Sequence, residues 1–385
     1  MSKKIIIIGP AHPLRGGLAS YNERLAKAFI DEGNDVALYT FSLQYPSFLF
    51  PGTTQYSTEP APKNLSIKAC INAINPFNWW RIGNVLKKLQ PDIIVVRYWL
   101  PFMGPCLGTI LRLVKKNKHT KIVCIADNII PHEKRIGDTL FTKYFVQPID
   151  AFITMSEKVM KDIPQFAPNT PAKFVPHPLY DNFGEKISKA TARAYLNIAT
   201  GEKIILFFGF IRKYKGLDIL FDAVKILQQQ ITDAPNAVQH LLPFKVLVAG
   251  EFYEDKKPYN DQIAQLGIAP HLILHTDFIP DSEVKYYLCA ADVVIQPYRN
   301  ATQSGVTPLA YHFETPMIVT NVGGLPSLVP NGKVGIIAEP NAADIAEKII
   351  TFFNTGSNYF LPYLIEEKKK YSWNKMTEAI IDVAK

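Results

Sequence analysis

The chain has 385 residues, of which 48% are hydrophobic and 20% are charged. This composition is typical of an ordered globular protein and excludes a disordered or fibrous chain. A single hydrophobic core rarely organises so many residues, so the length predicts two domains of about 150 to 200 residues each.

The formal net charge of +8 is unevenly distributed. Residues 1–185 contain 22 Lys and Arg against 14 Asp and Glu, whereas residues 186–385 contain 20 of each. The densest run, RLVKKNKHTK (112–121), is explained by a solvated helix end or by attraction to nucleic acid or the inner membrane leaflet. NPFNWWRIGNVLKKL (75–89) suits an interfacial membrane contact, and core packing of its tryptophans explains the pair equally well.

The beginning of the chain does not resemble a secretory signal. Its apolar run, residues 5–8, is too short for the core of a signal peptide. The longest uncharged apolar stretch, residues 98–111, contains two prolines and two glycines and is a poor membrane span. The four cysteines form no C-x-x-C pair, as expected for reduced thiols. We therefore expect a cytoplasmic protein, with peripheral contact to the inner face of the membrane if the basic half is used.

Strand and helix patterns alternate through the first half. Apolar strand patterns occur at KKIIIIG (3–9), DVALYTF (35–41), PDIIVVRYW (91–99), TKIVCIADN (120–128) and DAFITMS (150–156). Helical spacing separates them at residues 16–33, 80–89, 107–116 and 138–145. Strands this continuously apolar are buried on both faces, which is typical of a parallel sheet covered by helices.

A second alternating series follows an irregular region, residues 176–200, whose stretch PHPLYDNFGEKIS (176–188) is the predicted linker. Its strand patterns are EKIILFFGF (202–210), FKVLVAGEF (244–252), HLILHTDFI (271–279), ADVVIQPY (291–298) and PMIVTNV (316–322). The pattern predicts an α/β protein of two doubly wound Rossmann-like domains, residues 1–183 and 184–372, with the terminal helix 373–385 a candidate addition to the first. Ligands of such sheets bind at the carboxyl ends of the strands.

Two strand ends carry groups suited to an anion. Gly16 and Gly17 directly precede a helix, where backbone N–H groups approach an anion closely, although a plain turn explains them too and no G-x-G-x-x-G is present. Arg212, Lys213 and Lys215 also precede a helix. Cations oppose the helix dipole there, so this loop favours phosphate binding.

The motif order in the second half resembles glycosyltransferase family 4, the retaining glycosyltransferases of the GT-B fold. The resemblance rests on GFIRKYKG, VLVAGEF, DFIPDSEVKYYLCAADVVIQPY, SGVTPLAYHFETPMIVTNVGGLPSLV and a late YSW. The first half matches more loosely, through Gly16-Gly17, PDIIVVRYW, DNIIPHE and ITMSEKV. The resemblance implies two Rossmann-like domains facing a cleft, a nucleotide-sugar donor on the C-terminal domain, an acceptor on the N-terminal domain, and no metal or other cofactor.

Site residues follow from the same resemblance. Arg212 and Lys215 would hold the donor diphosphate, and His132 would lie near the donor sugar, although a structural loop histidine is an equal alternative. Nucleotide-sugar contacts are expected from Gly16, Gly17, Glu251, Phe278, Ile279, Gln303, Ser304, Gly305, Val306 and Thr307.

The chain departs from the family at two places. Phe210 stands where the family has the arginine of a Gly-Arg pair, so the diphosphate arginine would be Arg212. The two family glutamates, eight positions apart, align with Thr302 and Ala310. Backbone amides at Ser304–Val306 and the side chains of Gln303, Ser304 and Thr307 would then hold the donor, with Glu314 a weaker ribose candidate.

Two functions remain open. One is a metal-independent retaining glycosyltransferase that moves a sugar to a glycan or lipid-linked acceptor in cell-surface polysaccharide or glycolipid synthesis. The other is a catalytically silent relative that binds a nucleotide or glycan as a partner or scaffold. The missing glutamates favour the silent relative, and the cationic loop favours the enzyme. An ordinary capped core helix is the plain alternative for residues 302–313, and a nucleic-acid module lacks any recognised reading motif.

Overall fold

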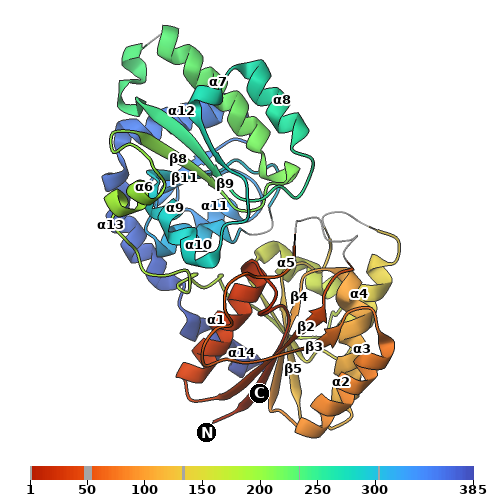
Figure 1. Ribbon diagram of the computed structural model, residues 1–385. Helices are drawn as coiled ribbons and strands as arrows, with labels where there is room; N and C mark the ends of the chain where they lie inside the picture. The colour runs from red at the N-terminus through yellow and green to blue at the C-terminus, as the bar shows by residue number, and fades with distance from the viewer. Residues whose placement is uncertain (1, 47–53, 132–134, 234, 302–303) are drawn as a thin grey trace. The chain divides into compact units, whose positions relative to one another are not determined.

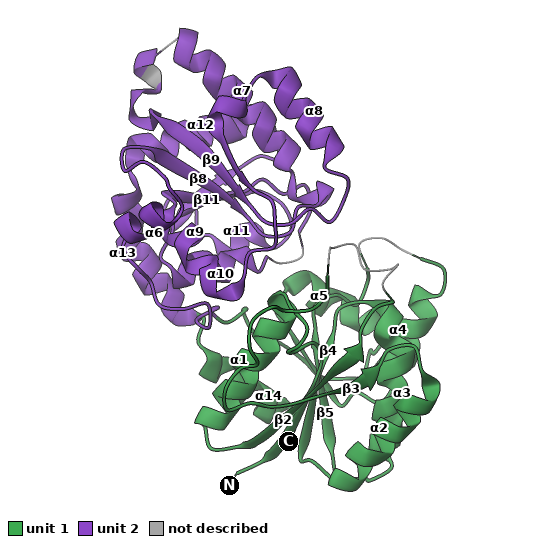
Figure 2. Ribbon diagram, in the orientation of Figure 1, with its two compact units in different colours: residues 1–178, 371–385 green, residues 179–370 purple. Residues whose placement is uncertain are grey.

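The computed structural model describes residues 2–46, 54–131, 135–233, 235–301 and 304–385 (Figure 1). The candidate site residues His132 and Gln303 lie outside the described residues, and so does Thr302. The chain forms two compact units (Figure 2): unit 1 contains residues 1–178 and 371–385, and unit 2 contains residues 179–370. Each unit is built around a parallel sheet with helices on its faces, which is the predicted α/β class.

Unit 1 contains a seven-stranded sheet in the order β3-β2-β1-β4-β5-β6-β7. Its strands are β1 (Lys4–Ile8), β2 (Asp35–Leu43), β3 (Ser66–Asn72), β4 (Ile93–Tyr98), β5 (Lys121–Ala126), β6 (Ala151–Thr154) and β7 (Ala172–Phe174). The two edge strands, β3 and β7, were not predicted from the sequence. Because most of their residues are only partly buried or exposed, neither carries the continuous apolar run that marks the inner strands.

Helices cover both faces of this sheet. They are α1 (Gly17–Asp31), α2 (Pro76–Leu89), α3 (Gly104–Lys115), α4 (Asp138–Val146), α5 (Glu157–Asp162) and α14 (Trp373–Val383). Helices α2, α3 and α4 lie side by side on one face (Figure 1). The C-terminal helix α14 lies against α1, where the Thr377 hydroxyl donates a 2.5 Å hydrogen bond to Glu32. The last helix of the chain therefore completes the first unit.

Unit 2 contains a six-stranded sheet in the order β10-β9-β8-β11-β12-β13. Its strands are β8 (Lys203–Phe208), β9 (Phe244–Ala249), β10 (Leu272–His275), β11 (Val293–Gln296), β12 (Met317–Thr320) and β13 (Gly335–Ala338). Its α-helices are α6 (Lys189–Tyr195), α7 (Leu217–Asp233), α8 (Lys257–Leu266), α9 (Val284–Ala290), α10 (Val306–His312), α11 (Leu325–Leu328), α12 (Ala342–Thr355) and α13 (Ser357–Glu367). Within the described ranges of the whole chain, none of the helices combines the length and apolarity needed to cross a membrane.

Helix α6 corrects the expectation of an irregular chain up to residue 200. The Ser188 hydroxyl caps it by accepting a 3.1 Å hydrogen bond from the Thr191 amide. The guanidinium of Arg193 on this helix is buried and lies 2.9 Å from the carboxylate of Asp292. The helix buries an arginine that pairs with a distant aspartate in place of a continuous apolar stripe. Its sequence therefore shows too little apolar periodicity for α6 to be predicted.

Candidate functional site

The loop after β8 runs beside the segment that follows β9. Gly209 ends the strand with a positive φ of 93°, which favours glycine. The amide of Ile211 donates to the carbonyl of Glu251 at 2.8 Å, and the amide of Tyr253 donates back to Ile211 at 3.0 Å. This ladder fixes the loop at the carboxyl edge of the sheet and leaves Glu251 almost fully buried beneath it.

Lys215 is a buried cation at this edge. Its residue is only 8% exposed, and its ammonium nitrogen lies 5.7 Å from the ring centre of Tyr298. A methyl group placed on Gly209 would lie 3.1 Å from that nitrogen and 3.7 Å from a methyl of Val306. Burial, and then the positive charge of Arg212, lower the pKa of Lys215 to about 7. Among the residues that the structure describes, no carboxylate pairs with this ammonium group.

Aromatic rings flank the second cation of the loop. The guanidinium carbon of Arg212 lies 5.2 Å from the ring centre of Tyr253. Phe210 stacks on Tyr253 with ring centres 4.1 Å apart, and its ring centre lies 6.5 Å from that of Phe278. Phe278 and its neighbour Ile279 are partly exposed in the loop after β10. Phe210, which we expected at the position of the family arginine, is therefore part of an aromatic surface beside the cations.

The start of α10 is placed next to Lys215 through Val306. The Ser304 hydroxyl accepts a 3.2 Å hydrogen bond from the Val306 amide and lies 3.3 Å from the Tyr298 hydroxyl. Gly305 is exposed at the helix cap. The Thr307 hydroxyl is buried and bonded to the side chain of Gln296 at 3.1 Å. Ser304 and Gly305 thus lie at the edge of the unit, whereas the Thr307 side chain bonds inside the core.

Ala310 was expected at the position of the family's second glutamate, and Glu314 was the alternative ribose candidate. The structure gives each of them a different role in unit 2. Ala310 is fully buried within unit 2. The Glu314 carboxylate bonds to Lys186 at 2.6 Å and also to Lys368. Burial raises the pKa of Glu314, but the hydrogen bonds from the two lysines outweigh it and leave the pKa below its usual value. Glu314 therefore joins separate segments of unit 2.

Gly16 and Gly17 lie at the corresponding edge of unit 1. Gly16 has a φ of 100° and its carbonyl accepts the amide of Ala19 at 2.9 Å, so α1 begins directly after it. The loop before it is fixed by side chains. The Ala11 amide donates to the Thr40 hydroxyl at 2.9 Å, and the His12 amide donates to Glu23 at 2.6 Å.

A buried polar cluster at the same edge was missed by the sequence analysis. Arg97 donates two hydrogen bonds of 2.6 Å to Asp127, and its guanidinium carbon lies 4.0 Å from the ring centre of Tyr21. The His177 ring meets Tyr21 edge-on with centres 5.0 Å apart. Burial lowers the pKa of His177 to about 3. An arginine inside the apolar strand IIVVRY and an aspartate ending the next strand were the available signals.

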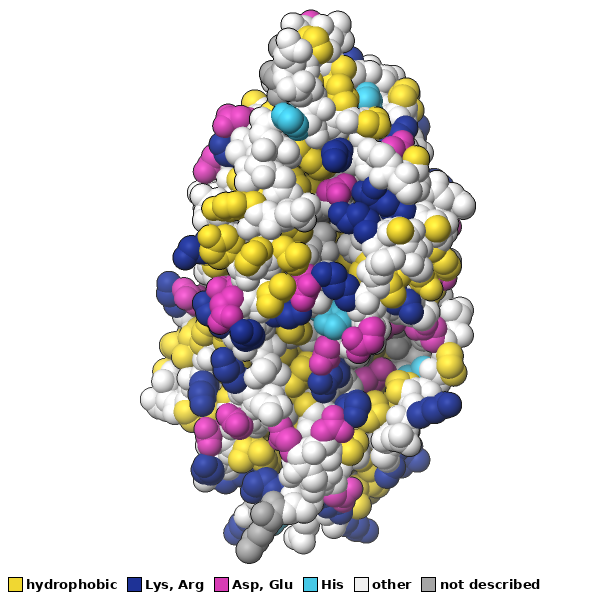
Figure 3. Space-filling model, turned by 90° about the vertical axis from the view of Figure 1, so that its left-hand side faces the viewer, with side chains coloured by type: hydrophobic (Ala, Val, Ile, Leu, Met, Phe, Trp, Pro, Cys, Tyr) yellow, Lys and Arg dark blue, Asp and Glu magenta, His cyan; other side chains and the backbone are white. Residues whose placement is uncertain are grey.

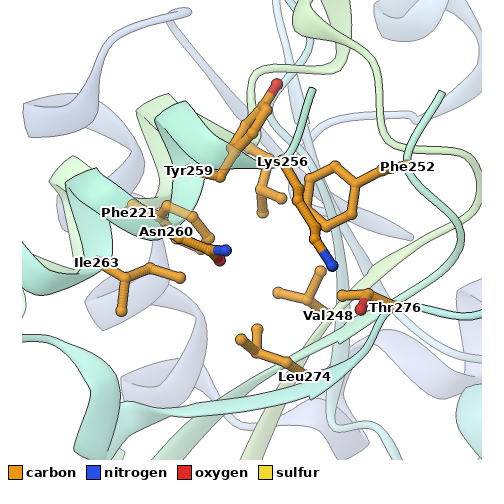
Figure 4. A pocket seen from close by; sticks show the side chains of 10 residues that line it. Phe221, Val248, Phe252, Lys256, Tyr259, Asn260, Ile263, Leu274 and Thr276 are labelled. Atoms are coloured by element: carbon orange, nitrogen blue, oxygen red, sulfur yellow. The ribbon is translucent and has the colours of Figure 1, made fainter. Parts of the chain in front are cut away.

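Unit 2 also has a small cavity (Figure 4), and its lining residue Phe252 is bridged to Ile211 of the loop after β8. It measures about 100 Å³ and lies between α7, α8 and the ends of β9 and β10. Sites for small molecules usually occupy about 300 to 1,000 Å³, so this cavity is too small for a nucleotide sugar. Within the described part of the chain, no group of three or more His, Cys, Asp or Glu side chains is arranged to hold a metal ion.

The structure thus collects most of the predicted donor-site residues in unit 2. Those found at or next to its carboxyl edge are Arg212, Lys215, Glu251, Phe278, Ile279, Ser304, Gly305 and Val306, and Thr307 follows them into the core. Gly16 and Gly17 belong to unit 1.

Two family models match the chain along nearly its whole length. Residues 188–370 match the model described as "Glycosyl transferases group 1". Residues 15–179 match the model described as "Glycosyltransferase Family 4". Together with the two parallel sheets, these matches show that the chain belongs to the group 1 and family 4 glycosyltransferases, which have the GT-B fold. It is a glycosyltransferase.

Individual relatives agree with this assignment. The chain is 24% identical over 313 residues to the D-inositol 3-phosphate glycosyltransferase of Corynebacterium urealyticum, covering 77% of this chain and 71% of the relative. It is 26% identical to an uncharacterized glycosyltransferase of Methanocaldococcus jannaschii, covering 99% and 98%. Among solved structures, Anabaena HepE in complex with UDP and glucose aligns with a TM-score of 0.72 at 14% identity, covering 98% of both chains.

Proposed function

We propose that the protein is a retaining glycosyltransferase that moves a sugar from a nucleoside-diphosphate sugar to a glycan or lipid-linked acceptor without a divalent metal. The observation that carries this proposal is the buried ammonium group of Lys215, which lies beside Arg212 and has no carboxylate partner among the described residues. A buried cation is costly unless an anion accompanies it. A diphosphate supplies that anion, and the similarity to a structure bound to UDP and glucose supports this choice of donor.

The chemistry assigned to this site is electrostatic. As the bond between the anomeric carbon and the diphosphate oxygen breaks, its electron pair moves to the leaving diphosphate. Arg212 and Lys215 would stabilise that negative charge. The acceptor hydroxyl oxygen forms the new bond on the same face of the sugar and passes its proton to the leaving phosphate oxygen, which gives net retention without a covalent enzyme intermediate.

The silent relative stays as a second candidate because a buried alanine, Ala310, stands where we expect one of the family glutamates. Ala310 is fully buried and offers no hydrogen bond to a ribose. A protein that binds the donor but does not transfer its sugar would retain the cations and lose these acids. Turnover, measured as release of free nucleoside diphosphate with and without acceptor glycans, separates the two candidates.

Thermal shift with UDP-, GDP- and ADP-sugars, each with and without EDTA, tests the donor site. We expect at least one donor to raise the melting temperature equally in both conditions. Absence of a shift with every donor would overturn the donor site, and loss of the shift on chelation would overturn metal independence.

Two variants locate the site. Arg212→Ala and Lys215→Ala should each abolish the shift, because each removes a cation assigned to the diphosphate. Lys333→Ala is the matched control, since Lys333 is exposed in the turn before β13 and lies outside the loop. A shift that survives both site variants would place the nucleotide elsewhere.

A further inference from the structure

Helix α2 of unit 1 presents large apolar side chains to solvent. Phe77 is 86% exposed and Trp80 is 63% exposed, and Ile74, just before the helix, is 50% exposed. The opposite face of the helix is buried through Ile82 and Leu86. Single exposed apolar residues are common on proteins, but two aromatic side chains one helical turn apart make a contiguous patch, and such patches mark contact sites.

The positive charge of the chain is concentrated around this helix. Residues 60–126 contain 11 Lys and Arg and a single acid, Asp92. The other 318 residues contain 31 Lys and Arg against 33 Asp and Glu, so by count the positive balance falls within this segment. Two of its cations, Arg97 and Lys115, are paired with Asp127 and Asp150 outside it. By contrast, basic and acidic side chains are interspersed on the face drawn in Figure 3.

Several of these cations are exposed on α2 and at the end of α3, in the same helical layer as the aromatic side chains, and Arg81 directly follows Trp80. Arg81 and Lys88 share the exposed face of α2, four and eleven residues after Phe77. Lys116 and Lys118 are exposed at the end of α3, where the Asn117 side chain donates to the carbonyl of Lys87 at 3.4 Å. Within the described ranges, none of these four cations forms an ion pair. We call Phe77, Trp80, Arg81 and Lys88 the α2 face.

A second apolar projection lies at the start of α4. Ile136 is fully exposed and Leu140 is 68% exposed. The starts of α2, α3 and α4 lie side by side. The Cys106 thiol of α3 is 3.9 Å from the carbonyl of Asn72 before α2, and a methyl group on Gly104 of α3 would meet the carbonyl oxygen of Phe141 in α4. Two apolar projections therefore flank the same edge of the helical layer.

We propose that the α2 face and the start of α4 dock onto an anionic lipid bilayer. Tryptophan and phenylalanine insert at the level of the headgroups, and the nearby lysines and arginine contact lipid phosphates. A second copy of the chain fits poorly, because a two-fold interface would bring two strongly basic segments together. Nucleic acid also fits poorly, because the aliphatic Ile136 and Leu140 have no ring to stack on a base. This proposal does not depend on the donor chemistry.

Flotation of the full chain with vesicles tests the proposal. We expect recovery with phosphatidylcholine vesicles that contain phosphatidylglycerol, little recovery with phosphatidylcholine alone, and a steep decrease with salt. Equal recovery with both vesicles, or no recovery with either, would overturn it. Protein that sediments as a dimer without lipid, and as a monomer when Trp80 is replaced, would assign the face to a second copy. Recovery of the protein on double-stranded DNA in place of the anionic vesicles would likewise contradict the proposal.

Matched variants test the residues. Replacing Phe77 and Trp80 together by serine should reduce the vesicle partition coefficient at least about tenfold, whereas serine at Tyr359 and Tyr363, two exposed residues of α13 in unit 2, should leave it unchanged. Lys88→Gln should reduce it about fivefold and Lys333→Gln should not. Because these side chains are exposed, all variants should keep the melting temperature of the native protein. Equal effects of a variant and its control would overturn the assignment to α2.

Discussion

Arg97 and Asp127 form a bidentate ion pair with two hydrogen bonds of 2.6 Å, and their side chains are only 3% and 6% exposed. The pair joins β4 to the end of β5 at the carboxyl edge of unit 1. Its burial makes the two partners interdependent, because either charge alone would remain in a poorly hydrated environment.

Asp127→Asn should therefore destabilise unit 1 by about 3 to 5 kcal/mol, because the Arg97 charge loses its partner while staying buried. All four tryptophans, Trp79, Trp80, Trp99 and Trp373, belong to unit 1, so tryptophan fluorescence during denaturant unfolding reports this unit. The control is Asp31→Asn in the exposed Lys27–Asp31 pair, which should change stability by less than about 1 kcal/mol. Similar losses in both variants would contradict the role of burial.

The lowered pKa of His177 should make the stability of unit 1 depend on pH. Its folded pKa of about 3 lies below its ordinary value, so the unfolded chain binds the extra proton between these two values. Stability should then rise with pH across this window and fall on acidification, by about 2 kcal/mol between about pH 7 and pH 5 from this group. His177→Gln should flatten the tryptophan-detected profile by that amount. Parallel profiles for the two proteins would refute the assignment.

Gly216, in the loop that carries Lys215, has no room for a side chain. It has a φ of 67°, and a methyl group there would lie 2.0 Å from the carbonyl oxygen of Pro297. Gly216→Ala should cost about 3 kcal/mol or more, as the sum of the left-handed backbone penalty and the overlap. Gly267 has nearly the same φ, 64°, with open space around it, so Gly267→Ala should cost only about 1 to 2 kcal/mol. Equal melting temperatures by circular dichroism would rule out the overlap.

Lys215 predicts proton uptake on nucleotide binding, if the proposed donor site is correct. Burial and Arg212 hold its folded pKa at about 7, and a bound diphosphate would raise it again. Above about pH 7 the free protein lacks this proton, so affinity for a nucleoside diphosphate should fall up to about tenfold per pH unit. Calorimetry in buffers of different ionisation enthalpy should detect about one proton taken up near pH 8. Lys215→Arg should remove both effects, and an unchanged proton count in that variant would exclude Lys215 as the source.

The inner strands were predictable because each is a continuous apolar run, and burial on both sheet faces requires such a run. Three of the four edge strands, β3, β7 and β13, were not, since short or half-exposed strands resemble loops in a sequence. The fourth, β10, was predicted because its residues LIL form an apolar run. Helix α6 was missed for a related reason. Its anchor is the contact between Arg193 and Asp292, which lie far apart in the chain.

For the candidate site, the sequence alone determined the family and the cationic loop, because both depend on residue types in a fixed local order. It also predicts that Thr302 and Ala310 stand where the family has its two glutamates, which stays a prediction. Only the tertiary structure decided which groups are buried, paired or exposed. It buried Lys215 without a carboxylate partner among the described residues, gave Glu314 two lysine partners, and left Phe77 and Trp80 in solvent. Pairing and exposure depend on neighbours that are distant in the sequence, and a local sequence pattern does not identify those neighbours.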